Sequence, residues 1–554
     1  MHVRRFLALV TVLFMVSGTT ACNVNQDNDN DEAPDTGITS LTWPISGIPS
    51  GFNPLLITDS AAALVETFIF QGLITYDEKG QVVPLLAQDW EVSADGREWT
   101  FYLREDVTWH DGEPFTAYDV EFTFNTWWFD PDLPVHWDGV ETLAGIVVYD
   151  EHTVGFELTG EYSYPQSIRN FRLPILPRHI YDPEVATGEN RVAIADMFDH
   201  PANQQPIGTG PYVFHPVDQQ PGFELRRNEN YWGAPRPYID IMRFKVVADT
   251  EAAMAALVAG ELDVFPNIPH GQINDILDEL PGHFNLYEHT YSMYYYIGFQ
   301  FDQEPFQSHF GFNPLADLDV RAALAHALDR REIVEQVAGG WGVLIDSPIM
   351  PECWTFTEDA CRYEYSPETA NDLLEAAGWI WQQGDDFRTW QQNPDIVFAL
   401  DLYLEQGNSR DEAIAALVKQ HLEEVGVKIN IIALPIETLL NDHLATGNYQ
   451  LIIWRNVVSR DLDAFTPFAK ENMGNSGNYQ NAQVTQILAQ LAGTVGDVEY
   501  RDLYQQLSLL VSGNLPYLFL YAPTSVSAVH QRVQDVQWGL GGLLRPETWS
   551  VPGE

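Results

Sequence analysis

Residues 86–125 read LAQDWEVSADGREWTFYLREDVTWHDGEPFTAYDVEFTFN. Within this stretch, large apolar side chains alternate with Thr and Tyr over residues 98–103, which is the period-two pattern of a strand with one buried face. The dipeptides Asp95-Gly96 and Asp111-Gly112 flank that strand and predict turns. Residues 116–125 continue as a short amphipathic helix. Since no catalytic group stands out in this block, the pattern predicts a scaffold.

The order of these residues is also distinctive. Written as LAxxWxxSxDGxxWTFxLRxxVxWHDGxPFTAxDVxFTF, it resembles the signature of the family 5 extracellular solute-binding proteins of ABC importers, the oligopeptide-, dipeptide- and nickel-binding group. Further segments resemble the same family in the same order: PIGTGPYVF (206–214), DVRAALAHALDR (319–330), YSPETANDLLEAAG (365–378) and LPYLFLY (515–521). The resemblance implies an α/β fold of the two-lobe periplasmic-binding-protein type, with a hinge and an inserted subdomain.

The N-terminal residues form a predicted export signal. Arg4 and Arg5 precede an apolar run at 6–16, which is too short to span a bilayer as a permanent helix. Small residues follow, and then Cys22. This resembles a bacterial lipoprotein signal, in which Cys22 becomes the lipidated N-terminus, although Thr19 stands where that signal usually has an aliphatic residue.

The folded part is predicted to follow an acidic tether. Residues 23–39 are polar and hold few large apolar side chains, so they cannot bury enough surface to offset the entropy of ordering. The resemblance then implies discontinuous lobes. They are lobe I at 40–80, 207–300 and 522–554, an inserted subdomain at 81–206, and lobe II at 301–521.

Charge and composition exclude several classes of protein. The chain has 28 Lys+Arg against 79 Asp+Glu, a net charge of −51, which opposes nucleic-acid binding because little would neutralise phosphates. A content of 45% apolar residues is enough for large buried cores. The excess of acidic residues is interpreted as a solvated surface.

Two cysteines remain after Cys22. An exported, oxidising setting predicts a disulfide between Cys353 and Cys361, with free thiols as the alternative. A zinc site needs four N, S or O ligands, so two cysteines alone argue against one.

Signatures of common enzymes are absent from the sequence. It contains no GxxxxGK[ST], HExxH, GxSxG or CxxC motif. The pair Gly208 and Gly210 is not interpreted as a phosphate loop, because Pro211 follows and no helix opens there. We therefore expect a binding protein with no cofactor, no metal and no catalytic residue; the alternative is an exported hydrolase.

Residues 411–431 predict one α/β unit. Apolar residues recur at helical spacing up to Val425, Gly426 ends the helix, and Val427 opens an alternating strand. Asp411 is expected to cap this helix.

The resemblance implies a ligand site between two lobes that close like a hinge. Aromatic and amide side chains suit such a site because they combine apolar area with hydrogen-bonding capacity. The family's cleft segments give the candidates Trp43, Asn53, Trp454, Asp461, Asp463, Asn478 and Tyr479. Core packing, capping or turn formation is the alternative role for each.

One departure from the family concerns the ligand. Peptide-binding members usually carry an Asp about three residues after the strand-ending Trp, and that carboxylate pairs with the peptide's amine. Here Trp454 is followed by Arg455, Asn456 and two valines, and the next acids are Asp461 and Asp463. An oligosaccharide, an opine or a metal chelate therefore stays open beside a peptide, and Arg455 could face an anionic group.

The resemblance implies a lipid-anchored receptor on the outer face of the cytoplasmic membrane, in the periplasm or at the cell surface. Its expected partners are a peptide or peptide-like solute, the permease and ATPase of an ABC importer, and the membrane, and it is expected to be a monomer. A sensory binding protein without a permease is a further alternative.

Overall fold

The computed structural model describes residues 39–57, 59–128, 143–159, 168–182, 197–217, 222–280, 282–382, 384–458, 464–469, 474–494, 496–539 and 542–551. The predicted signal with Cys22, and also Asp461 and Asp463, lie outside these residues. In the described part of the chain, no helix is both long enough and apolar enough to cross a membrane.

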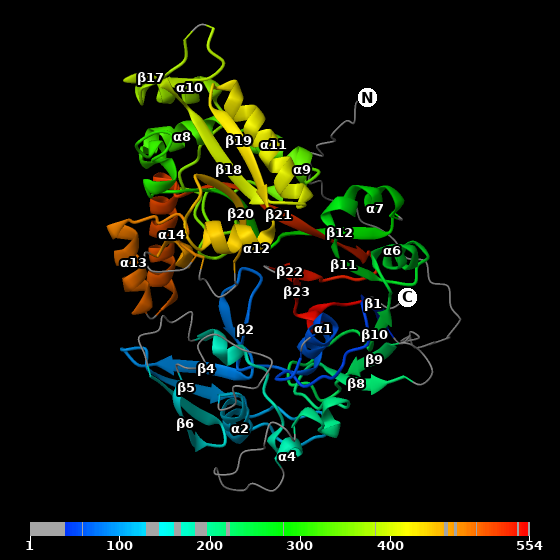
Figure 1. The fold of residues 1–554 in the computed structure, drawn as a ribbon. Helices are drawn as coiled ribbons and strands as arrows, with labels where there is room; N and C mark the ends of the chain where they lie inside the picture. Colours follow the sequence, from blue (N-terminus) through cyan, green and yellow to red (C-terminus); the bar gives the residue numbers. More distant parts are fainter. Residues whose placement is uncertain are drawn as a thin grey trace, which may run out of the picture. The chain divides into compact units, whose positions relative to one another are not determined.

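One core is built on a four-stranded sheet in the order β1-β10-β9-β8 (Figure 1). Its strands are β1 (Ser40–Ile45), β8 (Tyr212–Pro216), β9 (Gly222–Arg227) and β10 (Ile241–Val246). β1 pairs in parallel with β10, although the two strands lie far apart in the sequence. Helix α1 (Ser60–Ile69) contacts β8, and its N-cap Asp59 accepts a hydrogen bond from the Ala62 amide at 2.8 Å.

The quoted stretch 86–125 supplies two strands and the helix of a second, antiparallel sheet. Its elements are β4 (Ala87–Val92), β5 (Glu98–Leu103), β6 (Leu143–Asp150), β7 (Thr153–Leu158) and helix α2 (Ala117–Trp128). Trp99, Phe101 and Leu103 are buried, which confirms the predicted alternation. The Phe101 ring packs edge-on against Phe156, and its centroid lies 4.5 Å from that of Phe171. Buried side chains of the inserted sheet and of the first core belong to one hydrophobic cluster.

Two motifs of the sequence, WHDG and GTGPY, meet at what we call the His110 clamp (His110, Gly208 and Gly210). The Gly208 amide donates to Nδ1 of His110 at 3.2 Å, and the Gly210 carbonyl lies 3.0 Å from Nε2. Because an amide can only donate and a carbonyl can only accept, Nε2 carries the proton and the ring is neutral. Burial lowers the pKa of His110 to about 4.

Glycine is required on the other side of the clamp. A Cβ added at Gly208 would lie 1.9 Å from the Ile69 carbonyl oxygen, and one at Gly210 would lie 2.5 Å from the same oxygen. The GTG sequence therefore permits a close approach of two backbones, and it has no phosphate-loop geometry.

The largest sheet follows the order β11-β21-β13-β20-β18-β19, with β12 and β14 also paired to β21. Its strands are β11 (Val264–Ile268), β12 (Phe284–Thr290), β13 (Met293–Phe299), β14 (Gly342–Val343), β18 (Ala399–Glu405), β19 (Lys428–Leu434), β20 (Leu451–Val457) and β21 (Tyr517–His530). β18 runs parallel to both β19 and β20.

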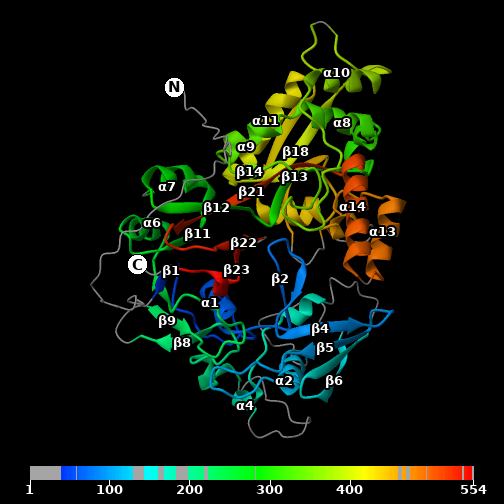
Figure 2. The same ribbon diagram turned by 180° about the vertical axis from the view of Figure 1, so that it is seen from behind.

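Strand β21 joins the two parts of this sheet. Its first half pairs with β13, and its second half pairs with β12 and β11. The strand, dark red in Figures 1 and 2, runs from the neighbourhood of β13 to that of β11 and β12. At the junction, the Tyr291 amide donates to the Pro523 carbonyl at 2.8 Å. Within this sheet, the chain reversal at 291–292 and β21 itself link the two parts.

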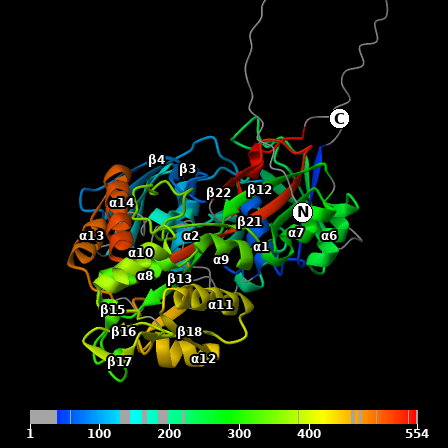
Figure 3. The same cartoon turned by 90° about the horizontal axis from the view of Figure 1, so that it is seen from above.

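Helices cover both faces of the largest sheet (Figures 1 and 3). One face packs on α8 (Leu318–Ala327), α9 (Arg330–Val337), α10 (Pro367–Ala376) and α11 (Ser409–Glu424). The opposite face packs on α13 (Ala482–Ala492) and α14 (Asp497–Asn514). Near β11 lie α6 (Thr250–Val258) and α7 (Ile273–Glu279), and α12 (Ile436–Thr438) with a π-helical turn (Leu439–Leu444) follows β19.

Shorter elements complete the described fold. They are the hairpin β2 (Ile74–Tyr76) and β3 (Val82–Pro84), the small sheet β15 (Trp379–Ile380), β16 (Thr389–Trp390) and β17 (Asn393–Val397), the pair β22 (Gln537–Gly539) and β23 (Gly542–Leu544), and helix α4 (Arg178–Tyr181). The turn of the first hairpin reaches the later part of the chain, because the Trp354 amide donates to the Lys79 carbonyl at 3.1 Å.

Candidate functional site

The carboxyl ends of β18 and β20 lie at one edge of the largest sheet. In open α/β sheets, ligands bind outside the carboxyl ends of the parallel strands, close to the start of the following helix. Here β18 ends at Glu405 and α11 begins at Ser409, while β20 ends at Val457. Charged side chains gather at this edge, and we call Glu405, Arg410, Asp411, Arg455 and Tyr295 the carboxyl-edge network.

Arg455 holds both acids of the network. Its Nη2 lies 2.9 Å from Glu405 Oε2, and its Nη1 lies 3.4 Å from Asp411 Oδ2. Glu405 also accepts a hydrogen bond from Asn408 Nδ2 at 3.1 Å. The Asn408 bond, followed by Arg455, lowers the pKa of Glu405, so this carboxylate is ionised at neutral pH.

Asp411 is the most buried member of the network. Its side chain is 1% exposed, and Oδ1 has no hydrogen-bond partner among the described residues. Burial raises the pKa of Asp411 to about 6, and Arg455 opposes that shift. The prediction that Asp411 caps α11 is wrong: the side chain of Asn408 caps the helix and accepts from the amides of Arg410 and Asp411. With the cap supplied by Asn408, the Asp411 carboxylate is left to face Arg455.

Arg410 binds a phenol. Its Nη1 donates to the Tyr295 hydroxyl at 3.0 Å, and its guanidinium lies 5.5 Å from the centroid of that ring. Tyr295 stacks in turn on Tyr521, with ring centroids 5.2 Å apart. Burial raises the pKa of Tyr521, so its hydroxyl stays protonated.

Apolar side chains border the network. Val457 is 75% exposed and lies opposite Met293 in the β13–β20 ladder. Side chains two residues apart on a strand share a face, so these two residues lie on the same face as Arg455 and Tyr295. Trp454 points to the other face, half-buried, with the Arg455 guanidinium 5.4 Å from its ring. The edge therefore combines a charged network with exposed apolar surface.

Of the predicted ligand residues that the structure describes, Trp454 lies at this edge. Trp43 is 1% exposed and stacks on Trp549 in the first core, and Asn53 is buried, where it donates to Asn203 Oδ1 at 3.1 Å. Both side chains are enclosed by packing, at a distance in the fold from β18 and β20.

Asn478 and Tyr479 form a turn near the start of α13. Asn478 has a φ of +54° and donates to Asp302 Oδ1 at 2.6 Å. Tyr479 packs on Phe301, and burial raises its pKa to about 12. The structure thus does not bring the predicted residues together, and their roles in binding stay predictions.

Sequence reasoning missed Glu405, Arg410 and Tyr295. A usable signal was present, because Glu405 ends an alternating strand and Arg410 and Asp411 open the next helix within a few residues. Charged residues at a strand-to-helix junction mark the carboxyl edge of an α/β sheet.

The predicted disulfide is not formed, because Cys353 and Cys361 are both free thiols. Each sulfur has its own surroundings. Cys353 Sγ lies 3.2 Å from the Thr355 hydroxyl, beside the core under α13 and α14, whereas Cys361 is exposed and close to Gly513. The expected oxidising setting predicted a bridge between the two cysteines, but local packing directs them to different neighbours.

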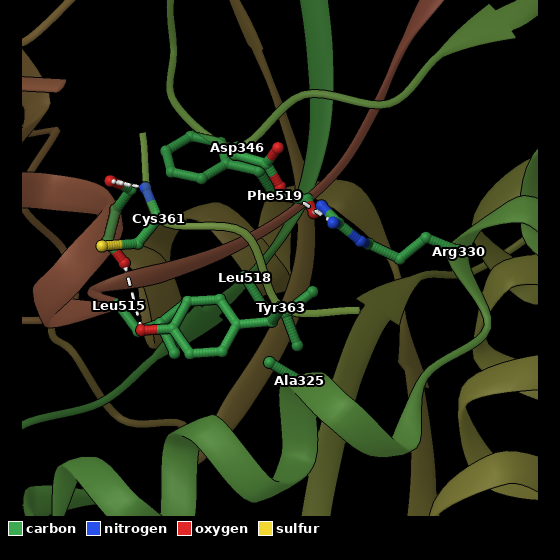
Figure 4. A pocket seen from close by; sticks show the side chains of 9 residues that line it. Ala325, Arg330, Asp346, Cys361, Tyr363, Leu515, Leu518 and Phe519 are labelled. Atoms are coloured by element: carbon green, nitrogen blue, oxygen red, sulfur yellow. Dashed lines mark hydrogen bonds and ion pairs between the residues drawn. The ribbon is translucent and has the colours of Figure 1, made fainter. Parts of the chain in front are cut away.

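Cys361 lines a small cavity with Arg330, Asp346 and Tyr363 (Figure 4). Its volume is about 10 Å³, enough for one water, whereas ligand pockets span several hundred Å³. Arg330 pairs with Asp346 at 2.8 Å and donates to the Ile345 and Phe519 carbonyls. These contacts hold α9 to β21, so this cavity is structural.

A larger depression, of about 480 Å³, opens on the inserted sheet beside Tyr102, Glu105 and Asp150. Across the described residues, no group of three or more His, Cys, Asp or Glu side chains is arranged to hold a metal ion.

Comparisons with known proteins agree with this architecture. Residues 81–475 match the family of bacterial extracellular solute-binding proteins, family 5, middle region. The chain is 27% identical over 501 residues to the oligopeptide-binding protein AppA of Bacillus subtilis, covering 89% of this chain and 88% of that protein. It is 24% identical over 540 residues to heme-binding protein A of Haemophilus influenzae, covering 91% of each.

Among solved structures, the unliganded open form of the periplasmic murein tripeptide-binding protein MppA matches with a TM-score of 0.77 and 22% identity, covering 93% of this chain and 98% of that chain. The predicted fold class, an α/β fold of the two-lobe periplasmic-binding-protein type, is confirmed. With more than half of its length matching the family, the chain belongs to the family 5 bacterial extracellular solute-binding proteins.

Proposed function

We propose that the protein is the extracytoplasmic receptor of an ABC importer, and that it captures a small peptide or peptide-like solute at the carboxyl edge of β18 and β20. The carboxyl-edge network carries this proposal, because it places hydrogen-bonding and apolar groups where α/β folds bind ligands. Binding proteins for oligopeptides and heme among the relatives favour capture over hydrolysis.

Capture of the solute would require the two lobes to close about the segments that connect them inside the largest sheet. The reversal at 291–292 and the middle of β21 act as the hinge between lobe I (40–80, 207–292 and 522–554, with the inserted subdomain 81–206) and lobe II. We assign β13 to lobe II, because it pairs with β20. A solute held between the lobes biases the closed form, which the permease recognises.

Trp454 is retained as a ligand residue from the sequence predictions, and Asp461 and Asp463 are proposed to border the site because they follow β20 closely in the chain. Arg455, which the sequence analysis offered for an anionic group, is also retained, and Glu405, Arg410, Val457 and Met293 are added from the structure. Trp43 and Asn53 are assigned to the core of lobe I.

Identification of the solute tests the proposed function. The full chain is purified from its native host without denaturant, and the bound solute is released and identified by mass spectrometry. A peptide or peptide-like molecule that also raises the Tm of the stripped protein is expected. If the bound molecule is a heme, a metal chelate, an opine or an oligosaccharide, the proposed receptor role stands and the proposed peptide class of solute is wrong. Turnover of the molecule by the protein would favour the hydrolase.

The membrane anchor is proposed to be a lipid on Cys22, joined to the folded part by the acidic tether 23–39. Metabolic labelling with palmitate and detergent-phase partition test it, with Cys22→Ser as the comparison. The wild type is expected to label and to partition into the detergent phase, and the variant to do neither. Equal behaviour of the two proteins would argue against the anchor.

A further inference from the structure

The charges of the carboxyl-edge network cancel one another. Two guanidiniums, of Arg410 and Arg455, face two carboxylates, of Glu405 and Asp411. Arg455 contacts both acids, and Arg410 binds the Tyr295 hydroxyl beside them. Above pH 6 the four groups sum to zero, although the whole chain carries a net charge of −51.

A charged solute would compete with the internal ion pairs of this arrangement. An ammonium group at Glu405 Oε2 would compete with Arg455 and Asn408, which both donate to that oxygen, and a carboxylate that takes Arg455 would separate it from Glu405 and Asp411. Asp411 is 1% exposed, so it would then be left as a buried charge without its partner. Leaving a buried charge uncompensated costs more than an exposed pair gains.

The surface beside the network is apolar. Val457 and Met293 form a cross-strand pair on the face that carries Arg455 and Tyr295. Val457 is largely exposed, whereas Met293 also packs on the core beneath α11. An apolar pair with one exposed member, next to a self-neutralised network, suits a group that is apolar and uncharged.

We propose that the solute meets this edge through an uncharged, apolar group that rests on Val457 and Met293, and not through a free ammonium or carboxylate. This inference rests on the proposed function and narrows its solute class. The neutral network would contribute hydrogen bonds from its outer atoms, while its internal ion pairs stay intact.

Peptides that share their sequences and differ only in the charges at their two ends test the inference. A pool of synthetic tetrapeptides rich in Phe, Leu and Val is prepared in four forms: both ends free, the amine acetylated, the carboxyl amidated, and both ends capped. Binding to the full chain at pH 7.5 is measured by Tm shift and by titration calorimetry. The doubly capped pool is expected to bind about tenfold more tightly than the free pool; equal or tighter binding of the free pool would overturn the proposal.

Charge variants give a second measurement. Arg455→Gln leaves the network negative and is expected to move the preference about tenfold toward the free-amine form. Glu405→Gln leaves it positive and is expected to favour the free carboxyl. The double variant Arg455→Gln with Glu405→Gln is expected to restore the preference for peptides with capped ends. Arg243→Gln, which breaks an exposed pair with Glu224 on β9, is the control and should change nothing. If both single variants keep the wild-type preference for capped peptides, the proposal that the neutral network selects an uncharged group is contradicted.

The proposed function can fail separately. If no peptide form binds, the solute recovered from the native host is tested instead. A solute without ionised groups supports the uncharged contact. A solute with an ionised group that binds Arg455→Gln or Glu405→Gln more weakly than the wild type overturns it. If that host preparation yields no solute and no peptide form binds, both proposals are rejected.

Discussion

His110 and Asp411 are both largely enclosed titratable side chains, yet they belong to regions of opposite character. Both ring nitrogens of His110 are bonded by backbone groups of Gly208 and Gly210, and the motifs that supply these residues are the most recognisable in the sequence. Asp411, in helix α11, faces Arg455 of strand β20, and its second oxygen has no partner in the described structure.

The difference separates scaffold from the proposed solute contact. The His110 clamp is fixed by backbone groups, because both ring nitrogens bond to the main chain and a Cβ at either glycine would meet the Ile69 carbonyl oxygen. The carboxyl-edge network is held together by contacts between side chains. The recognisable motifs therefore identify the family, and the proposed solute contacts lie in segments without a motif.

Two tryptophans that were both predicted to bind ligand give the sharpest contrast. Trp43→Ala removes a fully enclosed ring from the first core and is expected to cost about 4 kcal/mol of unfolding free energy. Trp454→Ala is expected to cost far less stability and to weaken solute binding. Urea unfolding and solute titration on both variants test this. Loss of solute binding by a still-folded Trp43→Ala variant would break the comparison.

Gly208→Ala tests whether the clamp is rigid. The new Cβ would meet the Ile69 carbonyl oxygen at 1.9 Å, and a backbone atom cannot move aside cheaply, so a loss of about 3 kcal/mol is expected. Gly271→Ala is the matched control, because nothing lies within 4 Å of a Cβ there. Similar Tm values for the two variants would show that the clamp yields.

The clamp also predicts a pH dependence. The folded pKa of His110 is about 4 and its ordinary value is 6.5, so between these values the unfolded chain binds a proton that the folded chain does not. The His110 contribution is complete above pH 6.5 and falls as the pH drops toward 4, by about 2 kcal/mol when its partial exposure is allowed for.

Urea unfolding of the wild type and His110→Ala at pH 5 and pH 7.5 measures this contribution. The difference in unfolding free energy between the two proteins is expected to be larger at pH 7.5. An equal difference at both pH values would contradict the assignment of a neutral ring.

Asp411 should show the opposite slope, and a smaller effect. Its folded pKa of about 6 lies above the ordinary 3.8, so the folded chain holds a proton in this window that the unfolded chain has lost. The contribution is present below pH 3.8 and is lost as the pH rises through 6. Asp411→Asn mimics the protonated form, so it is expected to be about 1 kcal/mol more stable than the wild type at pH 7.5 and equal to it at pH 4. A less stable variant at pH 7.5 would show that the ion pair with Arg455 outweighs burial.

Local patterns in the sequence predicted local structure well. The alternation in β5 and the helix after it depend on near neighbours, and the structure has both. The carboxyl-edge network depends on the parallel register of β18 and β20, which pairs Leu402 with Leu451 and so brings Glu405 to Arg455. No pattern within either strand encodes that register.

Residue type alone also could not tell a buried core side chain from one partly exposed at the candidate site. Trp43 and Trp454 both lie on apolar strands, and only the neighbouring strand and helices decide that Trp43 is enclosed. The cysteines illustrate the same limit, because their spacing allowed a bridge and three-dimensional packing placed them apart.

Strand β21 has a consequence for the order in which the protein folds. Every strand that it pairs with lies earlier in the chain, whereas β21 itself occupies 517–530. A chain that folds from its N-terminus can therefore complete neither part of the largest sheet until β21 is available. Until then, β13 and β12 expose unpaired edges, and such edges are templates for aggregation. The largest sheet is thus completed late, and a chain truncated before residue 517 should not accumulate in soluble form.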